Sequence, residues 1–187
     1  DYFTGSPTVM QTKEFGTGQT PSGTSVHVLN CLFRSITTGS DGAALYCKSV
    51  TYLLVESTSF FSCNTGVDDG GAIHFYNSGG QCVLYEVCGY NCYSTYTGTW
   101  PVGQFAYIYI SNSASSKNYV NYSSISRCVK ENLDSYSALW LVNGKIFCPS
   151  VNISMNKCHY RSGIYCCPYN DQNSVICSLT YSSIVDN

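Results

Sequence analysis

Cysteine returns at nearly regular intervals along this chain, at Cys63, Cys92, Cys128 and Cys158, with spacings of 29, 36 and 30 residues. Each of these cysteines closes a short segment that alternates apolar and polar residues and is rich in Val, Ile, Tyr, Phe and Thr, which favours β-strands. A second such segment follows most of the first ones, and Gly, Asn, Ser and Asp separate the two, as turns require. The sequence therefore contains an internal repeat of short strands.

A repeat unit of this size cannot bury its own apolar face, but a stack of such units can. Parallel crossovers are right-handed in nearly all known cases. We therefore predict an all-β fold, a right-handed parallel β-helix of about five to six rungs over residues 25–187. Residues 1–24 are rich in turn residues and carry no repeated cysteine, so we expect an N-terminal cap or arm there. An antiparallel β-sandwich is the alternative, although it gives no reason for one position to recur.

The chain has 12 cysteines, an even number without the tight clusters typical of zinc sites. This pattern favours disulfides in an oxidising compartment, hence a secreted or cell-surface protein, over a zinc site. Cysteines of equal phase on neighbouring rungs fall within the Cα separation that a disulfide needs. The candidate pairs are Cys63 with Cys92, Cys128 with Cys158, and Cys148 with Cys177.

Charged residues make up only 11% of the chain and the net charge is −2, so no basic field for nucleic acid is expected. No run of 18 apolar residues indicates a membrane span. Two sequons, at Asn121 and Asn152, lie 31 residues apart at nearly the same phase of the repeat. They predict glycans on one outer face of a secreted glycoprotein.

Two short motifs resemble a known family. The segment Phe61-Ser62-Cys63-Asn64 fits the pattern FxxN, and Gly70-Gly71-Ala72-Ile73 fits GGAI. Together they resemble the repeats of polymorphic outer-membrane proteins and similar repeats in cysteine-rich surface β-helix proteins of trichomonad protists. The resemblance implies surface display, adhesion or wall structure, without catalysis, a metal or a cofactor.

A second function class is a polysaccharide enzyme, because parallel β-helices also carry polygalacturonases and pectate lyases. Asp68 and Asp69 with His74 are the candidate catalytic residues, since glycoside hydrolysis uses paired carboxylates. Asp41 lies 28 residues before Asp69 and could stack on it, which also allows a calcium site. The Arg-x-Lys element of such hydrolases is absent, and Asp-Gly-Gly is ordinary turn chemistry. We therefore expect a turn here and no enzyme.

Aromatic residues could form a face that stacks on sugars or binds a partner, or ladders that stabilise the coil itself. They are Tyr107, Tyr109, Tyr119, Tyr122, Tyr136, Trp100 and Trp140. The last strand-like segment ends at the repeat position, which predicts either head-to-tail self-association into fibres or a segment of a larger surface protein. The function expected is thus non-enzymatic, structural or adhesive, and extracellular.

Overall fold

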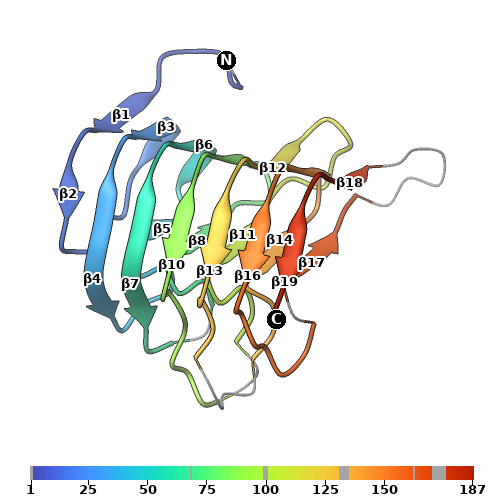
Figure 1. The fold of residues 1–187 in the computed structure, drawn as a ribbon. Coiled ribbons are helices and arrows are strands. Elements are labelled where there is room, and N and C mark those ends of the chain that lie inside the picture. Colours follow the sequence, from blue (N-terminus) through green and yellow to red (C-terminus); the bar gives the residue numbers. More distant parts are fainter. Residues whose placement is uncertain (1, 68, 99–100, 131–134, 162, 170–175) are drawn as a thin grey trace.

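The computed structural model describes residues 2–67, 69–98, 101–130, 135–161, 163–169 and 176–187. These residues form three sheets of parallel strands and no helix (Figure 1). Sheet A contains β1 (Thr8–Gln11), β3 (Gly23–Leu29), β6 (Val50–Glu56), β9 (Gln81–Tyr85), β12 (Lys117–Asn121), β15 (Lys145–Pro149) and β18 (Cys177–Thr180). Sheet B contains β2 (Glu14–Phe15), β4 (Leu32–Thr38), β7 (Ser59–Thr65), β10 (Cys88–Tyr90), β13 (Ser124–Ser126), β16 (Asn152–Ser154) and β19 (Ser183–Val185). Sheet C contains β5 (Leu45–Cys47), β8 (Ile73–Tyr76), β11 (Ala106–Tyr109), β14 (Leu139–Val142) and β17 (Ile164–Cys167).

The chain visits the three sheets in rotation, and one passage through sheets A, B and C is called a rung below. Each strand pairs in parallel with the strand of the same sheet one rung earlier and one rung later. The all-β, parallel part of the prediction is confirmed. The alternative of an antiparallel sandwich is wrong, because neighbouring strands within each of the three sheets run parallel to one another.

Side chains that point inward stack in register from rung to rung and form the core. In sheet B the inward position holds Phe33, Phe60, Gly89 and Ile125 on successive rungs. The rings of Phe33 and Phe60 stack with centroids 5.0 Å apart. Where Gly89 leaves a gap, the ring of Phe105, which precedes β11, enters and meets Phe60 edge-on at 5.7 Å. The core is therefore one continuous column of apolar side chains.

Sharp corners follow the strands of sheets A and B, and each corner uses a non-glycine residue with positive φ. Such residues are uncommon, yet the structure places them in two columns. The column after sheet A is Thr12, Asn30, Ser57, Glu86, Tyr122, Ser150 and Tyr181. The column in or after sheet B is Ser35, Ser62, Asn91, Arg127, Met155 and Asp186. On the middle rungs the residue after each of these corners is buried, as Thr58, Val87 and Cys92 are, which sets the phase of the repeat there.

Side chains just after the corners take over hydrogen bonds of the backbone. The N–H of Cys63 donates to Cys92 Sγ at 3.3 Å, and that of Cys92 donates to Cys128 Sγ at 3.5 Å. On the next rungs the acceptors are the Oδ1 atoms of Asn156 and Asn187. Each buried amide thus finds an acceptor on the following rung, as buried N–H groups require. This role explains why cysteine recurs along the chain.

All twelve cysteines are free thiols, so the predicted disulfides are wrong in this structure. Cys63 and Cys92 do stack, but in-register neighbours keep their Cβ atoms about one strand spacing, ~4.8 Å, apart. A disulfide needs about 3.8 Å between Cβ atoms. In the other two predicted pairs the cysteines do not occupy matching positions on neighbouring strands. Asn156 takes the position expected for Cys158 above Cys128, and Cys148 faces Leu179 rather than Cys177.

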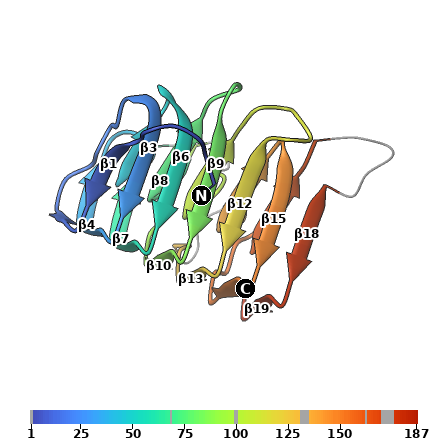
Figure 2. The same cartoon turned by 90° about the horizontal axis from the view of Figure 1, so that it is seen from above.

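The predicted N-terminal cap or arm contributes to the parallel sheets. Within residues 1–24, β1 pairs with β3 and β2 pairs with β4. Before β1 the chain crosses the outer face of sheet A (Figure 2). There the ring of Phe3 lies 5.3 Å from that of Tyr52, and the Tyr2 hydroxyl accepts a hydrogen bond from Asn121. No helix among the described residues has the length and apolar character needed to cross a membrane.

Candidate functional site

The predicted catalytic group is only partly brought together. Asp68 lies outside the described residues. Asp69 and Asp41 stack on neighbouring rungs, where the Asp69 N–H donates to Asp41 Oδ1 at 3.2 Å and the Val102 N–H donates to Asp69 Oδ1 at 2.9 Å. These contacts use the carboxylates as acceptors for the backbone of the next rung, as the turn interpretation expects.

Gly70, in the predicted GGAI motif, explains why a turn forms here. Its φ is +64°, and a Cβ atom at this position would lie 2.2 Å from the carbonyl oxygen of Ile73. Only glycine satisfies both constraints, since it lacks the Cβ atom. The motif therefore has a structural reason that needs no catalysis.

His74 lies on the outer face of sheet C, close to this turn. Its Nδ1 is 3.6 Å from Asp41 Oδ2, and its side chain is almost buried between the rings of Tyr46 and Tyr107. Burial lowers the pKa of the imidazole, and the nearby Asp41 carboxylate opposes this shift. Burial also raises the pKa of Tyr107 to about 12, with Asp69 adding to the effect. Both shifts favour the uncharged forms of His74 and Tyr107, which pack against each other with their rings stacked.

The predicted aromatic residues do not share one face. Tyr107, Tyr109 and Trp140 lie on sheet C, whereas Tyr119 lies on sheet A, under Tyr2. Tyr122 occupies a corner and Trp100 lies outside the described residues; Tyr136 meets Trp140 edge-on.

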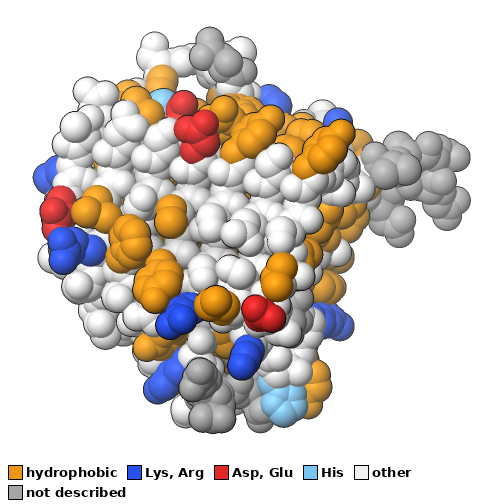
Figure 3. All heavy atoms as spheres, in the orientation of Figure 1, with side chains coloured by type: hydrophobic (Ala, Val, Ile, Leu, Met, Phe, Trp, Pro, Cys, Tyr) orange, Lys and Arg blue, Asp and Glu red, His pale blue; other side chains and the backbone are white. Residues whose placement is uncertain are grey.

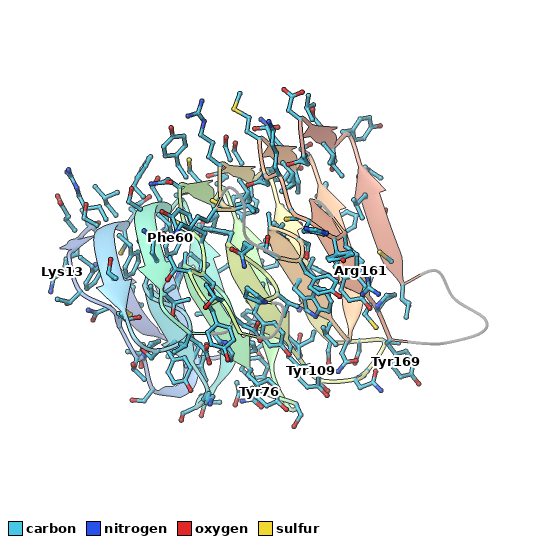
Figure 4. The ribbon with its side chains drawn as sticks, turned by 90° about the horizontal axis from the view of Figure 1, so that it is seen from below. Lys13, Phe60, Tyr76, Tyr109, Arg161 and Tyr169 are labelled. Atoms are coloured by element: carbon cyan, nitrogen blue, oxygen red, sulfur yellow. The ribbon has the colours of Figure 1, made fainter. Side chains whose placement is uncertain are left out.

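On sheet C the rings stack on one another along the rungs. The ring centroids of Trp140 and Tyr165 are 3.8 Å apart. Those of Tyr76 and Tyr109, both labelled in Figure 4, are 4.8 Å apart. The Arg161 guanidinium lies 4.6 Å from the centre of the Tyr165 ring. Ring faces that are occupied by neighbouring rings are closed to a sugar. The geometry thus favours the ladder interpretation of these aromatics.

The two sequons lie in different surroundings. The Asn121 side chain is 5% exposed and its Nδ2 donates to the Tyr2 hydroxyl at 3.0 Å. Asn152 begins β16 and is exposed on sheet B. Only Asn152 offers an accessible amide in this fold, so the two sites do not form the expected common glycan face.

A pocket of about 780 Å³ lies at the carboxyl ends of the sheet B strands. Its walls come from four successive rungs, after β10, β13, β16 and β19. The lining residues are Asn91, Tyr93, Arg127, Val129, Lys130, Met155, Lys157, Cys158, Asp186 and Asn187. Four of them belong to the positive-φ corner column, which turns their side chains outward. The volume lies in the range of small-ligand sites.

Basic side chains dominate this pocket, which we call the cationic pocket. Arg127, Lys130 and Lys157 are three of the nine basic residues of the chain, and Asp186 is the acidic residue in the lining. Figure 3 shows Lys and Arg side chains gathered near the lower edge of this face, with an acidic side chain among them. Within the described ranges, no carboxylate lies within ion-pair distance of these three cations.

Sequence reasoning missed the cationic pocket because Lys157 lies far along the chain from Arg127 and Lys130. The 30-residue spacing between Arg127 and Lys157 equals one repeat. That equality was the available signal, since residues of equal phase on adjacent rungs lie side by side. In the part of the chain that the structure describes, no cluster of three or more His, Cys, Asp or Glu side chains could hold a metal ion.

Three comparisons with known proteins found no similar protein. No family model matches the chain, and neither a curated protein nor a solved structure matches it.

Proposed function

We propose that this protein is a non-enzymatic, extracellular scaffold, a right-handed parallel β-helix, that binds an acidic oligosaccharide in the cationic pocket. The single observation that carries the proposal is the convergence of Arg127, Lys130 and Lys157 on one pocket, in a chain with few charges. Rotation of the chain through sheets A, B and C supports the β-helix. The role is adhesive, in keeping with the surface repeats that the FxxN and GGAI motifs resemble.

The ligand chemistry follows from the lining. Arginine binds carboxylates through two parallel N–H donors, and lysine adds a compact positive charge. The Oδ1 atom of Asn91 can accept a hydrogen bond from a sugar hydroxyl, and Tyr93 offers an aromatic side chain. A volume of about 780 Å³ is far larger than one inorganic anion needs. A uronic-acid oligosaccharide fits these features, because it alternates carboxylates with hydroxyls.

The test is binding of oligogalacturonate, with a neutral dextran oligomer as the control ligand, measured by calorimetry. We expect binding of oligogalacturonate alone, weakened by salt. Arg127→Gln and Lys157→Gln should each weaken it about tenfold, since a charge-assisted hydrogen bond contributes ~1.5–3 kcal/mol. The matched control is Lys145→Gln, an exposed lysine at the start of β15 in sheet A, which should bind as the unaltered protein does. Equal binding by all three variants would overturn the proposal.

The same mixtures test the enzyme alternative. Product formation from polygalacturonate that is lost in Asp69→Asn would establish a hydrolase or lyase and refute the non-enzymatic role. We expect no product, because Asp69 Oδ1 accepts the Val102 N–H and Asp41 Oδ1 accepts the Asp69 N–H. Reducing-end and unsaturated-product assays together cover both reaction types.

Self-association is part of the proposal and rests on the parallel pairing of strands from rung to rung in all three sheets. Strand edges with unpaired backbone groups readily accept another strand. We propose that copies of this chain stack head to tail in the same parallel manner. Regular filaments in negative stain would support this, whereas a monodisperse monomer at high concentration would refute it.

A further inference from the structure

Two thiols face each other between β17 of sheet C and β18 of sheet A. Cys166 points inward from β17, in register with Leu141, and Cys177 points inward from β18, in register with Ile146. Both thiols pack against the apolar core while remaining partly exposed. The two side chains are hydrogen-bonded to each other. The two cysteines thus meet across a rung, from sheet C to sheet A, rather than along a column.

We propose that Cys166 and Cys177 are a redox-active pair that closes to a disulfide and ties the last strand of sheet C to the last strand of sheet A. The difference from the stacked thiols is geometric. Stacked cysteines such as Cys63 and Cys92 project side by side in the same direction and remain about one strand spacing apart. Cys166 and Cys177 come from two different sheets and point toward each other, so their sulfur atoms can approach without a change in register. This inference does not depend on the proposed function.

The oxidant is a low-molecular-weight disulfide such as oxidised glutathione. The thiolate of one cysteine attacks a sulfur of that disulfide, forms a mixed disulfide and releases one thiolate of the small molecule. The second protein thiolate then attacks the protein sulfur of the mixed disulfide, and the other small thiol leaves. Two protein thiols and one small disulfide thus become one protein disulfide and two small thiols. Atoms and electrons balance without another reactant.

The environment assigns the roles within the pair. The Cys166 thiol donates to Cys177, which lowers the pKa of Cys177 to about 7 and raises that of Cys166. Cys177 therefore carries a substantial thiolate fraction near neutral pH and is the attacking sulfur. Burial raises the pKa of neighbouring Cys148 to about 12, which keeps this thiol out of the first step. Cys166 is the resolving cysteine.

The experiment begins with the fully reduced protein in graded glutathione buffers, followed by alkylation and peptide mapping. The expected result is that the first species to form carries ten alkylated cysteines instead of twelve, with Cys166 linked to Cys177. Cys166→Ser should accumulate a glutathione adduct on Cys177, and its formation rate should rise through about pH 7. Cys177→Ser should lose the internal disulfide and react at Cys166 more slowly. The matched control is Cys167→Ser, which removes the adjacent, exposed thiol and should still form the bond.

Two results would overturn the inference. If the first disulfide forms between Cys148 and Cys177, thiols on neighbouring strands of sheet A react before the pair that joins sheets C and A. Continued alkylation of both Cys166 and Cys177 in the unaltered protein, under buffers that already attach glutathione to the exposed Cys167, would mean that the two sulfurs cannot meet. Peptide mapping of the unaltered protein decides both points even if one serine variant fails to fold.

Discussion

The junction between Gly89 and Phe105 provides the sharpest test of the core. A Cβ atom built on Gly89 would lie 2.5 Å from Cε2 of the Phe105 ring, whereas ordinary contacts begin near 3.4 Å. Gly89→Ala therefore forces the buried ring to move by roughly 1 Å, and overpacking of this kind costs about 1–3 kcal/mol. Phe105→Ala instead removes a fully buried ring, which should cost about 3–5 kcal/mol.

The double variant separates this geometry from a general loss of stability. Without the ring, the methyl group of Gly89→Ala meets no clash and stiffens the unfolded chain, so its effect should fall to between zero and ~1 kcal/mol of stabilisation. The coupling free energy between the two changes should therefore be at least ~1 kcal/mol. Urea unfolding followed by circular dichroism and by tryptophan fluorescence measures all four proteins, and coincident curves establish two-state behaviour.

Gly39→Ala serves as the control for adding a methyl group to a glycine. Gly39→Ala adds a methyl group where no atom lies within 4 Å, so it should change the free energy of unfolding by less than ~0.5 kcal/mol. If the effects of Gly89→Ala and Phe105→Ala add to within ~0.5 kcal/mol, the ring does not fill the gap at Gly89. The described stacking of this part of the core would then be refuted.

Three further predictions concern the corners, pH and glycans. Cys92→Ala should destabilise more than Cys92→Ser, by ~1–3 kcal/mol in urea unfolding, because only the hydroxyl can still accept the Cys63 N–H; equal losses would contradict this. The free energy of unfolding should fall as pH drops below about 6.5, because unfolded His74 binds a proton that the buried imidazole resists, and this component should vanish in His74→Phe. Expressed in a glycosylating host, the protein should carry a glycan at Asn152 and none at Asn121, which mass spectrometry of glycopeptides checks; occupancy of Asn121 would show that Tyr2 does not cover it.

The all-β, parallel class and the length of the repeat can be read from the chain alone. Segments rich in Val, Leu and Tyr such as Val50–Glu56 favour strands, and a unit so short must bury its apolar face on its neighbours. The stacking of Cys63, Cys92 and Cys128 was also readable, because equal phase in a repeat means adjacency in space. The turn at Gly70 could be expected from its residue type alone, and its positive φ agrees.

Which partner each repeated side chain contacts depends on the three-dimensional packing of the rungs. A period of about thirty residues does not reveal whether a thiol faces a sulfur or a backbone amide, and a slip of two residues put Asn156 where Cys158 was expected. Likewise, the distance between Arg127 and Lys157, or between Cys166 and Cys177, depends on where each corner turns the chain. The corner residues adopt positive φ values, which are unfavourable for residues other than glycine, and packing between the rungs holds them in this conformation. Local sequence fixes the period, and contacts between rungs fix the phase.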